Sequence, residues 1–266
     1  MPWHPAQYLQ FAGERLRPAL DLLARIPLEN PRTIVDLGCG TGNVTKLLGE
    51  RWPDARIVGV DSSPEMLEAA RAATQDDPRY AFVAADLGQW RPGPPVDLVY
   101  SNAALHWLPD HAALFARAAA MVAPGGVLAV QMPDNFRAPS HTLIADIAGG
   151  SRWRAKLSGI LREPPVAAPA DYFAWLAPQL TTVDIWLTEY LQVLEPRPDG
   201  EHPVAVWTKG TWLVPFLEAL DERERAEFLR EYMQRLARVY PANADGRTLF
   251  PFRRLFIVAT RPGPNR

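Results

Sequence analysis

The 266-residue sequence contains one cysteine, Cys39, and therefore no pair of thiols for an internal disulfide. This excludes a fold held by disulfides, and we expect a reducing, cytoplasmic environment. No stretch approaches the roughly 18 consecutive apolar residues of a membrane-spanning helix. The first residues, 1–5, lack the basic and apolar regions of a signal peptide, so none is predicted.

The sequence also lacks a large excess of positive or negative charge. The net charge is −2 and no long basic run occurs, so a nucleic-acid partner is not expected. The adjacent pair Asp110 and His111 has no third ligand nearby in the sequence. Asp110 is better explained as the N-cap of a helix, and no metal site is predicted. Hydrophobic residues at 48% and charged residues at 22% indicate an ordinary folded globular protein.

Short apolar segments alternate with helical patterns through the first half of the chain. The expected strands cover residues 33–37, 56–61, 80–86, 97–102 and 127–132. This alternation predicts an α/β fold with a Rossmann-like, doubly wound and mostly parallel sheet. Two later apolar runs, about 183–193 and 255–260, extend the predicted sheet to seven strands. We expect the last strand to be antiparallel.

A glycine-rich loop follows the first predicted strand. Its spacing is Gly-x-Gly-x-Gly, whereas a dinucleotide fingerprint would place its third glycine at Asn43. Glycine is needed where the backbone turns tightly or where a ligand approaches it closely. Asp36, directly before the loop, would repel a pyrophosphate but would attract a cation. S-adenosylmethionine, which carries a sulfonium and an ammonium group, fits this arrangement.

Two further acids stand at the ends of the next predicted strands. Asp61 ends the second strand, whose tip faces the ribose of a nucleoside in a doubly wound sheet. Asp86 ends the third strand and can accept a hydrogen bond from an adenine amino group. One such acid alone is as readily explained as a cap or a solvated loop residue. Three acids beside one glycine loop favour a shared ligand.

With these motifs, residues 33–132 resemble the class I S-adenosylmethionine-dependent methyltransferases. The resemblance implies that the glycine loop packs on the methionine part of the cofactor and that the strand-end acids bind ribose and adenine. The residues that match the cofactor-binding positions are Asp36, Gly38, Gly40, Asp61, Met66, Asp86 and Asn102.

Nearly the whole chain resembles more closely the trans-aconitate 2-methyltransferases, a family that esterifies a carboxylate of trans-aconitate. The matching segments are 17–18, 27–30, 59–64, 106–111, 126–135 and 254–259. The chain departs from the family pattern at Trp212 and Val214, where family members carry glycine and arginine, and at Gln192, where some carry histidine. These departures bear on which carboxylic acid the protein methylates. Methylation of another small carboxylic acid or metabolite, or binding of the cofactor without catalysis, are the alternatives.

The sequence patterns outside the strand–helix repeat also predict how the chain is organised. We expect one methyltransferase domain over residues 1–266, with the cofactor-binding core at 33–135. Helical additions on the substrate side, forming a lid, are expected at 1–30, 149–178 and 203–240. The sequence leaves the oligomeric state open.

Methyl transfer to a carboxylate needs no general base, because the carboxylate is already ionised at neutral pH. We therefore predict no catalytic residue. His106 is disfavoured as a base, because a lone histidine beside a tryptophan more often packs or hydrogen-bonds. Cys39 is disfavoured as a nucleophile, because it has no identified activating partner in the sequence.

The substrate carboxylates are expected to bind arginines from outside the core, because arginine replaces lost hydration with paired N–H donors. The candidates are Arg17 and Arg254, while Arg253 should point to the opposite face of its strand. Trp107 packs on the adenine, walls the substrate site or packs in the core.

Overall fold

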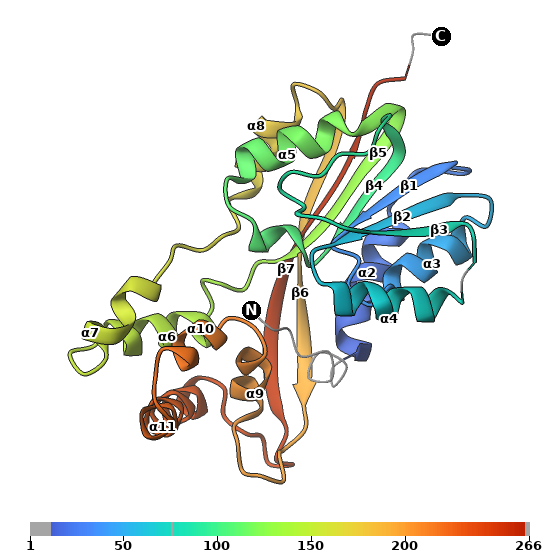
Figure 1. The fold of residues 1–266 in the computed structure, drawn as a ribbon. Coiled ribbons are helices and arrows are strands. Elements are labelled where there is room, and N and C mark those ends of the chain that lie inside the picture. The colour runs from blue at the N-terminus through green and yellow to red at the C-terminus, as the bar shows by residue number, and fades with distance from the viewer. Residues whose placement is uncertain (1–11, 76, 264–266) are drawn as a thin grey trace. The chain divides into compact units, whose positions relative to one another are not determined.

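The computed structural model describes residues 12–75 and 77–263 (Figure 1). The chain divides into two compact units. Among the described residues, the core unit holds 13–75, 77–133, 165–188 and 254–263, and the helical unit holds Ala12, 134–164 and 189–253. The predicted insertion at 149–178 thus contributes to both units. A single domain over the whole chain stays a prediction.

Seven strands of the described residues form one sheet in the order β3-β2-β1-β4-β5-β7-β6. They are β1 (Thr33–Leu37), β2 (Arg56–Asp61), β3 (Tyr80–Ala84), β4 (Val96–Asn102), β5 (Val122–Pro133), β6 (Thr182–Leu194) and β7 (Thr248–Thr260). The first five strands pair in parallel, and β7 runs antiparallel to β5. The Rossmann-like fold class is confirmed. The strand order reverses beside β1, where ligands bind in such sheets.

Three strands have a boundary that differs from the prediction by more than one residue. β3 ends at Ala84, because Asp86 caps a turn rather than extending the strand. β5 begins at Val122 and passes through two glycines, and its register against β4 is irregular there. β7 begins at Thr248, earlier than expected, because its first half alternates buried and half-exposed residues instead of being uniformly apolar.

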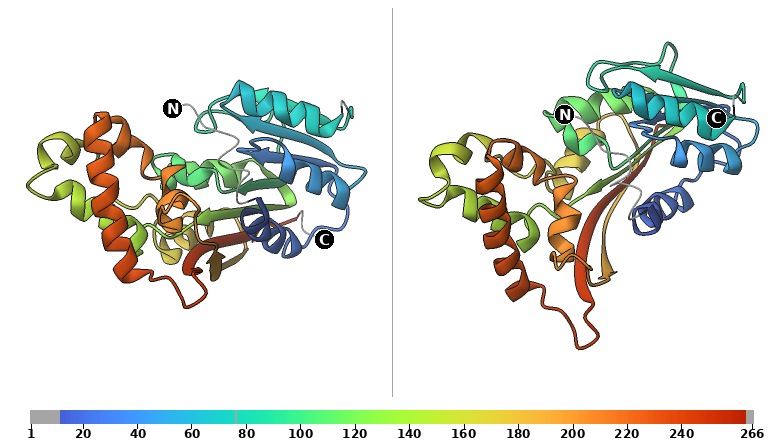
Figure 2. Two further views of the ribbon diagram at one scale, coloured as in Figure 1. Left: turned by 90° about the horizontal axis from the view of Figure 1, so that it is seen from below. Right: turned by 60° about the horizontal axis from the view of Figure 1, so that its bottom comes forward.

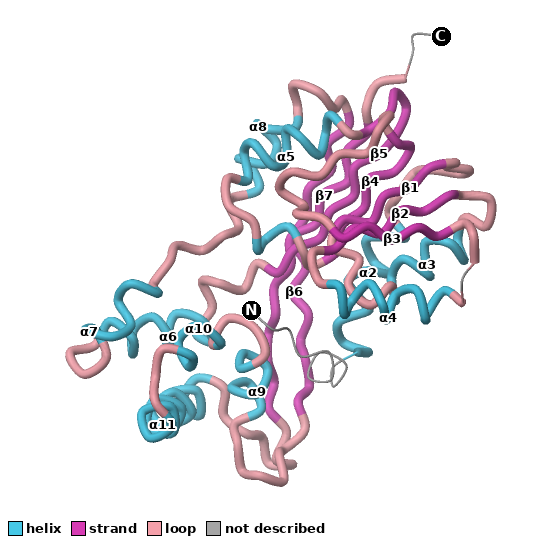
Figure 3. The backbone as a smooth tube through the Cα atoms, viewed as in Figure 1, coloured by secondary structure: helices cyan, strands magenta, loops and turns pink. Residues whose placement is uncertain are grey.

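Helices cover both faces of the sheet in the core unit. On one face lie α2 (Ala12–Ala24), α3 (Asn43–Arg51) and α4 (Pro64–Thr74), and on the other lie α5 (His111–Ala120) and α8 (Pro169–Leu176) (Figures 1 and 3). The hydroxyl of Tyr100 in β4 donates to the Ala19 carbonyl of α2 at 3.1 Å. The helix α2 continues through Pro18 without a break. None of the described helices is long and apolar enough to cross a membrane.

The helical unit is built around α11 (Glu222–Val239), drawn in red-orange in Figure 2. Its other described helices are α6 (Pro139–Gly149), α7 (Arg154–Leu157), η2 (Ser158–Ile160), α9 (Pro203–Lys209) and α10 (Val214–Glu218). The short helix η1 (Leu105–Trp107) belongs to the core unit. Asp221 and Glu224 form a capping box at the start of α11. Phe228, Tyr232 and Leu236 of α11 are buried, and the hydroxyl of Tyr232 donates to the Ser140 carbonyl at 2.6 Å, which joins α11 to α6.

Candidate active site

The three glycines of the loop all have positive φ angles, but they serve different purposes. A Cβ on Gly38 would lie 2.1 Å from the Cβ of Ala104, and one on Gly42 would lie 2.9 Å from the Cβ of Ala70. Both positions therefore need glycine for packing inside the protein. A Cβ on Gly40 would meet no atom within 4 Å. Gly40 is the loop glycine beside open space, where a ligand can approach the backbone.

Asp61 ties this loop to the end of β2. One carboxylate oxygen accepts from the Gly40 N–H at 2.9 Å, and the other accepts from the Ser63 N–H at 3.0 Å. Asp86, which is exposed, accepts from the Gly88 N–H at 2.8 Å. Each carboxylate thus stabilises a local turn. Each oxygen has a further lone pair, so a cap of this kind remains able to accept from a ligand hydroxyl or amino group.

Asp36 is buried at the end of β1 and accepts a 2.6 Å hydrogen bond from the hydroxyl of Thr45 in α3. Burial raises the pKa of the Asp36 carboxyl to about 7, the Thr45 hydrogen bond opposes this increase, and the charge of Asp61 adds to it. A buried carboxylate of this kind is stabilised by a nearby cation. This charge fits the cationic ligand that the sequence predicts.

Two other predicted residues lie near the loop. Met66 is buried in the first turn of α4, where its N–H donates to the N-cap hydroxyl of Ser63 at 3.3 Å. Asn102 ends β4, two residues before the Ala104 that packs on Gly38. The Oδ1 atom of Asn102 is buried and has no hydrogen-bond partner. An unsatisfied buried acceptor and the open space at Gly40 both fit a polar ligand at this edge.

Of the two candidate arginines, only Arg254 is buried. It is 4% exposed, and its Nη1 donates to the Oε1 of Gln131 at 3.5 Å. Arg253 points to the other face, as predicted, and its Nε lies 3.0 Å from a carboxylate oxygen of Asp134. Arg17 has a 72% exposed side chain on α2, 4.0 Å from Asp21. The geometry therefore favours Arg254 as a carboxylate-binding residue.

Gln131 was missed by the sequence reasoning. It is fully buried in β5, and its Nε2 atom has no hydrogen-bond partner. The available signal was a single amide side chain inside the apolar segment 127–132.

The aromatic and histidine residues after β4 have distinct environments. Trp107 is 42% exposed, so core packing does not account for it. Its ring lies 4.6 Å from that of His106, which is buried. His111 is also buried, between the hydroxyl of Tyr172 at 2.6 Å and the Leu105 carbonyl at 3.2 Å. Burial lowers the pKa of His111, which favours a neutral imidazole that donates from Nε2.

The remaining reactive groups have structural explanations. Asp110 accepts from the Ala113 N–H at 3.1 Å and caps α5, as predicted. The described part of the chain contains no group of three or more metal-ligating side chains. Cys39 is buried, and burial together with two nearby carboxylates raises the pKa of its thiol, which disfavours a nucleophilic thiolate.

Trp212, one of the departures from the family pattern, is buried within the helical unit. Its ring centroid lies 4.8 Å from that of Phe136, and it also packs against His141. The guanidinium of Arg162 lies over its ring at 3.9 Å. Trp212 thus belongs to an aromatic cluster in this unit.

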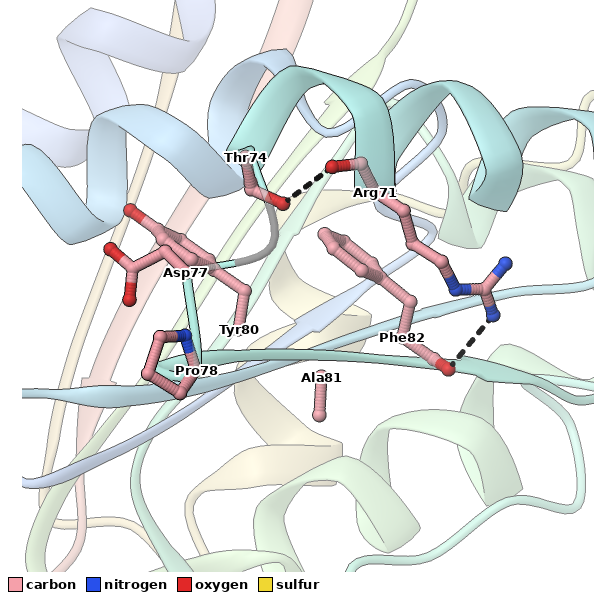
Figure 4. A pocket seen from close by; sticks show the side chains of 7 residues that line it. All are labelled: Arg71, Thr74, Asp77, Pro78, Tyr80, Ala81 and Phe82. Atoms are coloured by element: carbon pink, nitrogen blue, oxygen red, sulfur yellow. Dashed lines mark hydrogen bonds between the residues drawn. The ribbon is translucent and has the colours of Figure 1, made fainter.

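A pocket of about 300 Å³ lies between α4 and β3 (Figure 4). Arg71 crosses it and donates to the Phe82 carbonyl at 3.4 Å, and Thr74 donates to the Arg71 carbonyl at 3.2 Å. Its lining includes Tyr80 and Asp77, at the amino end of β3. The glycine loop and strand-end acids lie at the opposite, carboxyl ends of the strands, so this pocket is not the candidate site.

Comparison with known proteins identifies the family. A trans-aconitate 2-methyltransferase of Azoarcus sp. is 49% identical over 97% of this chain and 99% of its own length. Those of Methylobacterium nodulans and Shigella dysenteriae are 50% and 46% identical, each over 97% of this chain and 98% of their own length. The chain belongs to the trans-aconitate 2-methyltransferase family. A family model described as a methyltransferase domain matches residues 34–126 of this methyltransferase.

Solved structures agree on the fold of the methyltransferase. YcgJ of Bacillus subtilis superposes with a TM-score of 0.60 at 15% identity, over 93% of this chain and 100% of that one. Phosphoethanolamine N-methyltransferase 2 of Haemonchus contortus, solved in complex with S-adenosyl-L-methionine, gives a TM-score of 0.54 at 17% identity, over 92% of this chain and 52% of that one.

The different packing of two loop glycines predicts different costs of substitution. In Gly38→Ala, the new Cβ collides with Ala104 at a positive φ, and we expect the methyltransferase to lose about 3 kcal/mol of unfolding free energy. In Gly40→Ala, only the positive φ opposes the change, and we expect a loss of about 1 kcal/mol. Urea denaturation without ligand measures both losses. Equal losses in the two variants would contradict this assignment.

The buried Asp36 predicts a pH-dependent stability of the ligand-free methyltransferase. Its pKa is about 7 in the folded state, against about 4 in the unfolded chain. The folded state therefore binds the proton of the Asp36 carboxyl more tightly than the unfolded chain does. This tighter binding stabilises the fold fully below about pH 4. This contribution is lost as the pH rises to about 7.

Asp36→Asn removes this dependence. Between pH 5 and pH 7, wild type should lose stability relative to this variant by on the order of 1 kcal/mol per pH unit. Denaturation at several pH values measures the difference, with the exposed Asp146→Asn as the matched control. Parallel curves for wild type and Asp36→Asn would show that Asp36 is ionised throughout.

Proposed function

We propose that the protein transfers the methyl group of S-adenosylmethionine to a carboxylate of trans-aconitate and forms a monomethyl ester. The observation that carries the proposal is the near full-length identity with relatives of that name, at 49% and 50% for two of them. The glycine loop, the strand-end acids and a buried arginine at the same edge of the sheet support it chemically.

The proposed cofactor contacts follow the carboxyl ends of the first four strands. The ribose hydroxyls bind Asp61, the adenine amino group binds Asp86, and Met66 lines the nucleoside pocket. Gly38, Gly40 and Asn102 would hold the methionine part, and Asp36 would supply negative charge near it. When bound, S-adenosylmethionine supplies a methyl group on a cationic sulfur; the carboxylate oxygen bonds to the methyl carbon while the carbon–sulfur electron pair stays on sulfur.

The chain's own residues bind, orient and exclude water rather than move protons. The substrate carboxylate is ionised at neutral pH, so no side chain has to remove a proton. The raised pKa of the Cys39 thiol disfavours a nucleophilic thiolate. Alignment of the oxygen with the methyl group is the main contribution expected from the protein.

The substrate-binding residues of this proposal are Arg254, Trp107 and Arg17. The burial of Arg254 supports its role, because a desolvated guanidinium binds a carboxylate strongly. The exposed indole of Trp107 is suited to wall a site. A substrate contact of Arg17 stays a prediction, and it has less support than that of Arg254 because the Arg17 side chain is exposed to solvent. The lid formed by the helical additions also stays a prediction.

The proposal includes a cytoplasmic location, which is compatible with the free, buried thiol of Cys39. The partner is a small carboxylic acid.

The activity is tested by incubating the purified protein with labelled S-adenosylmethionine and trans-aconitate, and by mass analysis of the product. We expect a monomethyl ester. A panel of other small carboxylic acids tests the alternative substrates. Cofactor binding without any methylated product across the panel would favour a non-catalytic binding protein and overturn the proposal.

Asp61→Ala should weaken S-adenosylmethionine binding by about 1–3 kcal/mol, because the ribose hydroxyls lose a charged acceptor. The variant also releases the N–H groups of Gly40 and Ser63, so the melting temperature is recorded in parallel. Isothermal titration calorimetry measures the affinity, with the exposed Asp146→Ala as control. Wild-type affinity in a folded Asp61→Ala protein would remove Asp61 from the cofactor site.

Arg254→Ala should raise the KM for trans-aconitate at least tenfold, since a buried charged donor is worth more than about 1.4 kcal/mol. The affinity for S-adenosylmethionine should stay near the wild-type value. Arg17→Ala, which removes an exposed side chain, should change KM less. Steady-state kinetics measure both. An unchanged KM in both variants would mean that neither arginine binds the substrate.

A further inference from the structure

A row of polar side chains crosses three strands on one face of the sheet. Asn102 of β4 is the register partner of Gln131 of β5, and Arg254 of β7 is the partner of Pro133, two residues beyond Gln131. Register partners, and residues two apart in a strand, share a face. The three side chains therefore lie on one face, at the carboxyl ends of β4 and β5. This is the face that carries Asp36, whose register partner is Tyr100.

Gln131 has one satisfied and one unsatisfied polar atom in this row. Its Oε1 accepts from Arg254 at 3.5 Å, which fixes the orientation of the amide and directs Nε2 away from the guanidinium. The Nε2 atom is buried without a hydrogen-bond partner, in a residue of zero exposure. Buried amides are normally paired, and an unpaired one in a native structure calls for an explanation. The neighbours of Gln131 on the same face, Ala129 of β5 and the register partner Phe256 of β7, are buried and apolar, so they provide no acceptor.

We propose that Gln131 has two roles toward the substrate: its Oε1 positions Arg254, and its Nε2 donates a hydrogen bond to a carboxylate. The inference rests on the proposed function, because the carboxylate belongs to the acid that is methylated. The acceptor expected beside the Nε2 of Gln131 is a carboxylate, because the adjacent guanidinium of Arg254 attracts an anion. Asn102 stands between Gln131 and the glycine loop, which places Gln131 on the side away from the cofactor loop.

Two variants separate these roles. Gln131→Met keeps the length of the side chain and removes both polar atoms. Gln131→Glu keeps an acceptor for Arg254 but replaces the donor with a second carboxylate oxygen, which repels the substrate. Gln179→Met is the matched control, because the Nε2 of Gln179 already donates to the Ala116 carbonyl at 3.0 Å. Melting temperatures establish that each variant is folded.

The measurements for trans-aconitate are kcat, KM and Kd. The Kd of S-adenosylhomocysteine is measured as well, to detect any effect on cofactor binding. Mesaconate and cis-glutaconate, which keep the double-bond geometry of trans-aconitate and each lack one of its three carboxylates, test recognition directly. In wild type, at least one analogue should have a kcat/KM far below that of trans-aconitate. We expect both Gln131 variants to raise KM about tenfold or more, Gln131→Glu the more strongly, and to reduce the preference for the tricarboxylate. Gln179→Met should change neither quantity.

Three results would overturn the inference. If both Gln131 variants keep the wild-type KM and acid preference, the amide is structural only. If they weaken S-adenosylhomocysteine binding and leave the Kd of the acid unchanged, the carboxylate belongs to the cofactor. If all acids lose kcat/KM by the same factor, Gln131 supports folding rather than recognition. Failure of the proposed function is distinguishable, because the wild-type protein would then neither bind nor methylate trans-aconitate.

Discussion

The candidate site depends on the close contact between Gly38 and Ala104. No side chain fits between them, because a Cβ on Gly38 would lie 2.1 Å from the Cβ of Ala104. The contact holds the glycine loop against the end of β4. The loop is fixed from its other side by Asp61, which accepts from the Gly40 N–H. Gly40 is thereby held with free space beside its Cα. A ligand can approach the backbone closely only where such space exists.

Several polar groups at this edge are poorly satisfied in the absence of a ligand. Asp36 is buried with a raised pKa, and the side chains of Asn102 and Gln131 each bury a polar atom without a partner. Such groups lower stability, and native proteins retain them mainly where function uses them. The large apolar core around them, including Tyr100 and Phe256, offsets this cost. The protein thus combines a well-packed sheet with a polar edge prepared for charged ligands.

Much of the fold was predictable because its signals are local. Each of the first strands is an apolar run that ends in an acid or an amide, and the helices begin at recognisable caps such as Ser63 and Asp110. The larger errors occurred at β5 and β7, where tertiary pairing extends a strand beyond its apolar run. β7 begins at Thr248, in a segment whose alternating burial depends on packing rather than on composition.

The sequence by itself determined the order of the elements, the type of sheet and the class of ligand, because glycine spacing and strand-end acids act within a few residues. Only the tertiary structure decided which loop glycine is packed and which is open, since this depends on Ala104 and Ala70. It alone also brought Gln131 to Arg254, 123 residues later in the chain. That contact exists because β7 inserts antiparallel beside β5, and no local pattern encodes the register of two such distant strands.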